Sequence, residues 1–124
     1  MLVVLSRGEV LLQKRPPSGI WGGLWSLPEI EVGPDPAREL RRSLGIEAAR
    51  TQRLEPFEHA FTHFTLEVEP WLVTPRRPAA LAERSCVWMP LAELAGAALP
   101  SPVRRLLKGL GRGSNQSLLL EELV

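Results

Sequence analysis

The stretch that decides the fold is DPARELRRSLGI, residues 35–46. Asp35 is a residue type that caps helix N-termini, and Pro36 suits the first helical position. The apolar residues that follow recur at the spacing of one helix face: Ala37, Leu40 and Leu44. Gly45 supplies a C-terminal stop. These signals predict an amphipathic helix with defined ends.

Upstream of this helix, two short apolar runs at residues 2–5 and 10–14 flank Arg7 and Gly8. Runs of this kind around a short turn predict a β-hairpin. Residues 20–28 then combine two tryptophans with two adjacent glycines. Neither a regular helix nor a strand is predicted for that segment.

Downstream, apolar and polar residues alternate over residues 64–69, which predicts a half-buried strand. Pro70 in that run predicts an edge or a bulge, with residues 71–73 continuing the strand. A further strand is predicted at residues 85–89, followed by a short helical turn at residues 90–94.

A second helix is predicted near the C-terminal end. Ser101 and Pro102 repeat the cap-and-proline signal. Apolar residues follow at helical spacing: Val103, Leu106, Leu107 and Leu110. The order of strands, helix, strands and helix favours an α/β domain with a mixed sheet.

The composition fits a single domain, because 124 residues that are 44% hydrophobic and 23% charged are enough to form a core. No apolar run approaches the roughly 20 residues of a membrane helix, and residues 1–10 do not resemble a signal peptide. We assign residues 1–111 to the domain. Residues 112–124 are predicted to be a tail or linker, and a partner-binding role or an expression-vector origin stays open.

The single cysteine, Cys86, makes no internal disulfide and cannot alone hold zinc or an iron–sulfur cluster. It is predicted to be a buried strand residue. A reducing, cytoplasmic location fits this cysteine usage best.

The net charge of +1 is spread unevenly, with two basic clusters. The clusters are Arg38, Arg41 and Arg42, and Arg104, Arg105, Lys108 and Arg112. Basic clusters often face phosphates. On charge alone, two solvated helix faces are the favoured interpretation.

The first helix also carries part of a known motif. Residues 38–40, followed by residues 44–46, resemble the second half of a Nudix box. In the Nudix family, glutamates on this loop and helix hold Mg²⁺, which polarises a diphosphate for attack by water. The family pattern has two glutamates where this chain has Arg42 and Ser43.

This departure predicts a loss of the metal chemistry. Arg42 and Ser43 lie three and four residues after Glu39, so all three share one helix face. The guanidinium repels a cation, and the spacing of Glu29 and Glu31 does not fit the full box. We therefore predict no metal site and no catalytic residue, and a structural hydrogen bond or ion pair for Glu39.

A second set of motifs resembles the C-terminal domain of MutY-type adenine DNA glycosylases. The matching segments lie in the family order at residues 12–16, 19, 21–25, 27–29, 61–66, 99–104 and 106–107. The resemblance implies a Nudix-like α/β/α sandwich with a mixed sheet and two main helices. It also implies a module that reads 8-oxoguanine opposite adenine in base-excision repair.

The same resemblance implies the site residues. In this family a phenylalanine, a serine or threonine, and a histidine at a turn contact 8-oxoguanine, and here these are Phe61, Thr62 and His63. A hydroxyl can donate to the extra oxygen of the lesion or accept from its N7–H, and an aromatic ring can wedge beside a base. On spacing alone, a core phenylalanine followed by two strand residues is favoured, but the surrounding motifs reverse this preference.

Two other side-chain groups have structural interpretations. His59 and His63 lie four residues apart in a segment of loop and strand, so no shared metal is predicted. The four tryptophans are predicted to pack in the core or on the sheet, with a nucleic-acid platform as the alternative.

The resemblance finally implies partners. In that family a separate N-terminal domain cleaves the adenine–sugar bond and usually carries the iron–sulfur cluster. We expect this chain to be non-catalytic and free of cofactors, with two partners: that glycosylase domain and duplex DNA containing 8-oxoguanine opposite adenine. No membrane partner is expected, and the implied location is cytoplasmic, at the bacterial nucleoid. The alternatives are an active Nudix hydrolase of a nucleoside diphosphate derivative and a protein-interaction domain.

Overall fold

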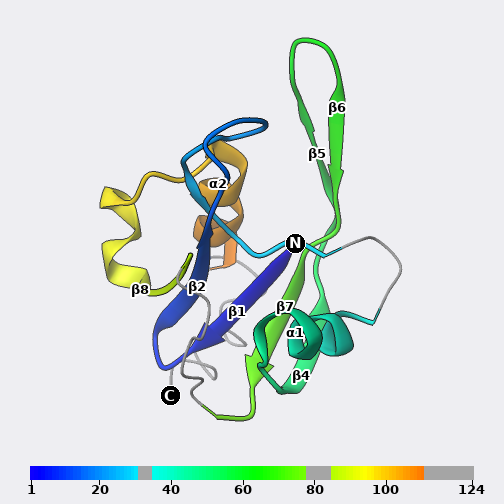
Figure 1. Cartoon of the computed structure of the whole chain (residues 1–124), viewed down its shortest axis with the longest axis vertical. Coiled ribbons are helices and arrows are strands. Elements are labelled where there is room, and N and C mark those ends of the chain that lie inside the picture. The colour runs from blue at the N-terminus through cyan, green and yellow to red at the C-terminus, as the bar shows by residue number, and fades with distance from the viewer. Residues whose placement is uncertain (31–34, 78–84, 111–124) are drawn as a thin grey trace.

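A computed structural model describes residues 1–30, 35–77 and 85–110, so predictions for Glu31, Arg112 and residues 112–124 lie outside it. The described residues form a six-stranded sheet (Figure 1). Five strands run in the order β3 (Trp25–Ser26), β2 (Glu9–Lys14), β1 (Leu2–Ser6), β7 (Trp71–Pro75) and β4 (Ala48–Arg53). β8 (Cys86–Pro90) pairs with β2. The predicted mixed sheet is confirmed, because β1 and β7 are parallel and the other pairs are antiparallel.

β1 and β2 form the predicted hairpin, with Ser6 opposite Glu9. Arg7 and Gly8 have φ angles of 51° and 79°. Positive φ at both central residues gives a turn whose twist matches that of the paired strands. The turn therefore fixes the register of the central strands.

Helix α1 (Pro36–Leu44) begins and ends where the sequence predicts. The Asp35 carboxylate accepts a hydrogen bond of 3.0 Å from the Ala37 N–H. Gly45 has φ 68°, and its N–H donates to the Arg41 carbonyl at 2.9 Å. Glycine takes up this left-handed conformation without a Cβ clash, so the helix ends there.

The sheet has a helix on each face. Leu40 of α1 belongs to a buried cluster with sheet residues Leu2, Val4, Leu11 and Val73. Helix α2 (Ser101–Leu110) contributes to the other cluster, with Val3, Leu5, Val10, Leu12, Val103, Leu107 and Leu110. Successive side chains of a strand point to opposite faces, so β1 is buried on both. The predicted α/β/α sandwich is confirmed.

The 3₁₀ helix η1 (Leu91–Gly96) lies at the predicted helical turn after β8. Arg104 of α2 is bonded to it. Its guanidinium donates to the carbonyls of Leu94 at 3.1 Å and Ala97 at 2.6 Å. This member of the second basic cluster therefore joins α2 to η1 and the residue that follows it.

The prediction of one strand over residues 64–69 and 71–73 is wrong. β6 (Thr65–Val68) pairs with β5 (Phe57–Ala60) in a separate two-stranded sheet, whereas β7 lies between β1 and β4. Pro70 separates the two because it has no N–H for a sheet hydrogen bond. The chain therefore leaves the main sheet after β4, forms a hairpin and returns at β7.

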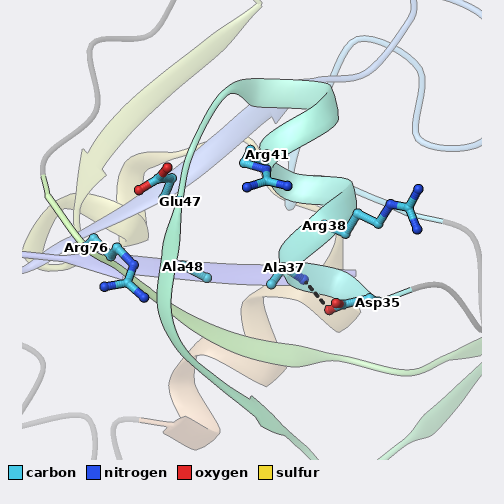
Figure 2. Close-up of a pocket in the computed structure, with 7 residues that line it drawn as sticks. All are labelled: Asp35, Ala37, Arg38, Arg41, Glu47, Ala48 and Arg76. Atoms are coloured by element: carbon cyan, nitrogen blue, oxygen red, sulfur yellow. Dashed lines mark hydrogen bonds between the residues drawn. The ribbon is translucent and has the colours of Figure 1, made fainter.

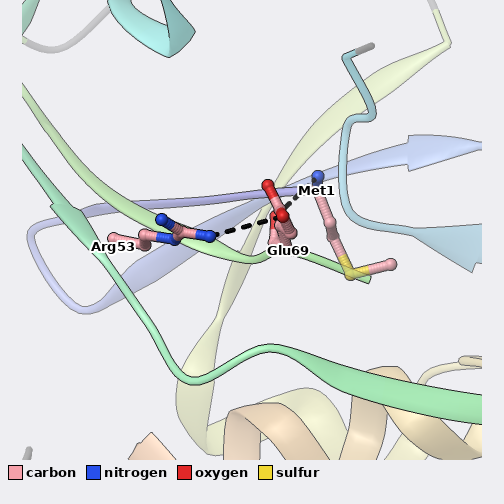
Figure 3. Close-up of polar contacts among 3 residues, drawn as sticks. All are labelled: Met1, Arg53 and Glu69. Atoms are coloured by element: carbon pink, nitrogen blue, oxygen red, sulfur yellow. Dashed lines mark hydrogen bonds and ion pairs between the residues drawn. The ribbon is translucent and has the colours of Figure 1, made fainter. Parts of the chain in front are cut away.

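The β5–β6 hairpin extends away from the sheet (Figure 1), and polar contacts fix its root (Figure 3). An ion pair joins Arg53 Nη2 to Glu69 Oε1 at 3.3 Å. The Leu54 N–H donates to the Pro70 carbonyl at 2.9 Å. The Met1 amino group donates to the Glu69 backbone carbonyl at 3.4 Å, and burial lowers the pKa of that amino group. The ends of β1, β4 and the hairpin thus meet at one point.

The remaining sequence predictions concern single residues. Cys86 lies in β8 but is half-buried, not buried as predicted. The tryptophans pack against the two core clusters as predicted: Trp21 and Trp25 on one, Trp71 and Trp88 on the other. The described part of the chain has no helix long and apolar enough to cross a membrane.

Candidate nucleic-acid interface

The predicted lesion-binding residues lie together at the tip of the β5–β6 hairpin. Ala60 pairs with Thr65, which leaves residues 61–64 as the connecting turn. The Phe61 N–H donates to the Phe64 carbonyl at 2.7 Å and closes the turn. Thr62 and His63 therefore occupy the apex, the part of the hairpin farthest from its root.

The tip is open to solvent. Thr62 and His63 are exposed, and within the described residues neither side chain has a hydrogen-bond partner. Phe64 is 46% exposed, the only large hydrophobic side chain in the described part that is exposed. An unpaired hydroxyl beside an exposed ring can serve both hydrogen bonding and stacking.

Phe61 is half-buried in a cluster of aromatic rings. Its ring stacks on Phe64 with a centroid distance of 4.7 Å and an interplanar angle of 22°. His59 lies edge-on to Phe61 at 4.8 Å, and the Trp21 ring lies 5.8 Å from Phe61. Phe64 is thus the outer ring of the stack and Phe61 the inner ring. The sequence analysis assigned the wedge to Phe61 and placed Phe64 in a half-buried strand, whereas in the structure Phe64 belongs to the turn and its ring is the exposed one.

The two faces of the hairpin differ in polarity. Phe57, His59, Leu66 and Val68 share the face that is buried or half-buried. Glu58 and Glu67 lie directly opposite each other on the exposed face. Two carboxylates in this position repel each other and also repel DNA phosphates. The acidic face is therefore unfavourable for a phosphate-bearing ligand.

The helix face that resembles the Nudix box is occupied by an ion pair. Arg42 Nη2 lies 2.7 Å from Glu39 Oε2, which confirms the predicted structural role of Glu39. Upstream, Glu29 Oε2 lies 3.2 Å from Arg15 Nη1. Both glutamates are thus neutralised by arginines of the chain itself. No group of three or more His, Cys, Asp or Glu residues that could hold a metal occurs in the described ranges.

A hollow of about 500 Å³ lies beside α1 (Figure 2). Its charged lining residues are Asp35, Arg38, Arg41, Glu47 and Arg76. Figure 2 shows Arg38 pointing away from Arg41 and Arg76. The hollow thus mixes both signs of charge, and α1 lies well away from the hairpin tip (Figure 1).

Comparison with known proteins places the chain in a family. The model of the NUDIX domain matches residues 1–109. The chain belongs to the NUDIX domain family. This NUDIX domain is also 29% identical to the adenine DNA glycosylase of Mus musculus, in a match that covers 87% of the chain and 24% of the mouse protein. The domain therefore spans about a quarter of the length of that curated relative.

Solved structures agree with this placement. The C-terminal domain of mouse MUTYH, crystallised with human PCNA, is 26% identical, with a TM-score of 0.70 over 86% of this chain and 81% of that one. A MutT structure, from work on the Aliivibrio salmonicida and Vibrio cholerae proteins, is 23% identical, with a TM-score of 0.63 over 88% of this chain and 93% of that one. The MutT likeness is one of fold alone. The predicted resemblance of the NUDIX domain to the C-terminal domain of adenine DNA glycosylases is confirmed.

Proposed function

We propose that this NUDIX domain is a non-catalytic module that recognises 8-oxoguanine opposite adenine, as part of an A/G-specific adenine DNA glycosylase. The observation that carries the proposal is the hairpin tip, where Thr62, His63 and Phe64 are exposed together at the end of a projecting hairpin. The similarity to the mouse glycosylase supports the assignment to DNA repair.

The chemistry of the tip fits an 8-oxoguanine. This base differs from guanine by an oxygen at C8 and a proton at N7, and the Thr62 hydroxyl can donate to the first or accept from the second. The stacked rings of Phe61 and Phe64 offer an apolar surface for a base or sugar. His63 adds a polar group beside them. Together these groups can address the edge and the face of one nucleotide.

Residues outside the hairpin tip are also expected to contribute to the affinity for DNA. Phosphate contacts supply most of the binding energy in DNA complexes, whereas base contacts supply the discrimination. Arg105 and Lys108 of α2 are exposed, and neither side chain makes a hydrogen bond or ion pair with the described residues. They are candidates for phosphate contacts, and Thr62 is the candidate for discrimination.

The same structure disfavours the alternative that this chain is an active Nudix hydrolase. Mg²⁺ needs several oxygen ligands, and a Nudix site gathers them as carboxylates on α1. Here the α1 carboxylate on that face is Glu39, which is bound to Arg42 at 2.7 Å. Placing a cation there would require breaking the ion pair and would set the cation against a guanidinium. A Nudix fold is therefore proposed to serve here as a binding scaffold.

A protein partner remains compatible with this role. The domain is proposed to act beside a separate glycosylase domain of the same protein, with any iron–sulfur cluster in that other domain. The related mouse domain was crystallised with human PCNA, so domains of this kind also bind proteins. Residues 1–111 are proposed as the recognition module, with residues 112–124 as a tail, and a cytoplasmic location is proposed for the whole protein.

Chemical-shift mapping tests the proposal. A duplex with one 8-oxoguanine:adenine pair is added to the ¹⁵N-labelled chain, and backbone amide shifts are followed at low salt. The largest changes are expected at residues 61–64, with smaller changes near Arg105 and Lys108 of α2. Changes confined to α1, with a silent hairpin tip, would contradict the proposed interface.

A further inference from the structure

The angle of the β5–β6 hairpin is not set by main-chain pairing with the central sheet. In the described part of the chain, β5 pairs with β6 alone. Hollows border the hairpin on both sides. One of about 260 Å³ lies between the 15–30 segment and β6, and one of about 300 Å³ lies between β5 and α2. Side-chain contacts must therefore hold the upper hairpin in place.

Trp21 provides contacts of this kind near the turn. Its ring lies 6.0 Å from the His59 ring and 5.8 Å from the Phe61 ring, so it touches the hairpin just below the turn. The same side chain packs against the core cluster under α2. Trp21 thus connects the hairpin turn (residues 61–64) to the body of the domain, although the two segments lie nearly 40 residues apart in the sequence.

The backbone around Trp21 is held in an unusual conformation. Trp21 has φ 54°, a left-handed value that L side chains rarely adopt. The Gly23 N–H donates to the Pro16 carbonyl at 3.0 Å, and the Leu24 N–H donates to the Trp21 carbonyl at 3.1 Å. A Cβ on Gly22 would lie 2.6 Å from the Pro17 carbonyl oxygen. A bulky residue kept at positive φ in so tight a loop is a strained feature of the kind found at functional sites.

We propose that Trp21 is a positioning residue: it fixes the hairpin tip and so presets the place of Thr62, without touching the lesion itself. The link runs from the Trp21 ring to Phe61, and from Phe61 through its N–H bond to Phe64, across the turn that carries Thr62. The role in lesion reading rests on the proposed function. The positioning of the tip does not, and it can be measured without DNA.

Trp21→Leu is the main variant, because leucine keeps apolar bulk against the core but removes the ring. Trp21→Phe is the conservative variant, which keeps an aromatic contact. Gly22→Ala displaces the loop while leaving the Trp21 side chain intact, since the added methyl group meets the Pro17 carbonyl. Trp88→Leu is the matched control, because Trp88 is also half-buried but packs on the other core cluster.

The first readout is amide hydrogen exchange of the free, full chain. The Phe61 N–H, which is bonded to the Phe64 carbonyl, is expected to exchange about tenfold faster in Trp21→Leu and in Gly22→Ala. Trp21→Phe is expected to restore most of the protection, and Trp88→Leu to leave it unchanged. Unchanged exchange at Phe61 in folded Trp21→Leu overturns the proposal. If that variant does not fold, Gly22→Ala decides by the same readout, and unchanged exchange at Phe61 in Gly22→Ala then overturns the proposal.

The second readout is the affinity ratio for duplexes with 8-oxoguanine:adenine and guanine:adenine pairs. Trp21→Leu is expected to lower the ratio about fivefold, with Trp21→Phe close to the wild type. If the wild-type chain binds the two duplexes equally well, the proposed function is refuted. The positioning role of Trp21 is then decided by the hydrogen exchange of the Phe61 N–H alone. A faster-exchanging tip with an undiminished ratio refutes the role of Trp21 in reading the lesion.

Discussion

Replacing Thr62 with alanine removes the hydroxyl and the γ-methyl group from the apex of the hairpin, and Thr62→Ser separates the two because it removes only the methyl group. Thr62 is exposed and makes no hydrogen bond within the described residues, so the free energy of unfolding should change by less than about 0.5 kcal/mol. If the hydroxyl addresses the C8 oxygen or the N7 proton, one hydrogen bond is lost in the complex with the lesion. That loss costs about 1 kcal/mol, or about fivefold in affinity.

The assay compares two duplexes that differ only in 8-oxoguanine or guanine opposite adenine. The Thr62→Ala variant should lose about fivefold on the lesion duplex and little on the other, and Thr62→Ser should match the wild type. Thr65→Ala is the matched control, because Thr65 is an exposed threonine of the same hairpin just beyond the turn. Equal loss on both duplexes, or the same selective loss in Thr65→Ala, would show that the Thr62 hydroxyl does not read the lesion.

Four further outcomes are expected. The chain should show no Mg²⁺-dependent release of phosphate or pyrophosphate from nucleotides, and hydrolysis that a chelator abolishes would reverse this interpretation. DNA binding should be weak and should fall steeply with salt, since each phosphate contact releases a counterion; salt-independent binding in a titration would count against it. Arg104→Met should lower the free energy of unfolding by about 2 kcal/mol in denaturant titrations, because the carbonyls of η1 lose their donor, whereas the exposed Arg105→Met should change it little. Glu58→Gln should stabilise the chain by about 0.5 kcal/mol at low salt by relieving repulsion from Glu67, and a loss of stability would show that the pair is not repulsive.

The parts of the fold that local chemistry determines could be predicted from the sequence. α1 was predicted to its ends because Asp35, Pro36 and Gly45 each act on the adjacent backbone. The β1–β2 hairpin followed from a turn pair between apolar runs. In both cases the decisive interactions join residues close together in the chain.

The missed strands lack such local signals. The sequence of β4 is Ala-Ala-Arg-Thr-Gln-Arg, in which apolar and polar residues do not alternate. The strand forms because its backbone pairs with β7. β3 has two residues and depends on β2. At Pro70 the chain passes from one sheet to the other, but the sequence predicted only an edge or a bulge there. The sequence does not indicate which strand pairs with the residues before Pro70 and which with the residues after it.

The candidate site shows the same division. Phe61, Thr62 and His63 were predicted together because they are adjacent and belong to a recognisable motif. The exposure of Phe64 depends on how the turn closes, and the contact between Trp21 and Phe61 joins segments 40 residues apart. Only the folded chain brings those rings together.

The central claim is that this domain distinguishes 8-oxoguanine from guanine opposite adenine. The most direct test is the ratio of dissociation constants of the wild-type chain for duplexes that differ only at C8 and N7 of that base, measured by fluorescence anisotropy at one ionic strength. The account predicts at least about fivefold tighter binding to the lesion duplex, the worth of one hydrogen bond. Equal affinity for the two duplexes, under conditions where both bind, would contradict it.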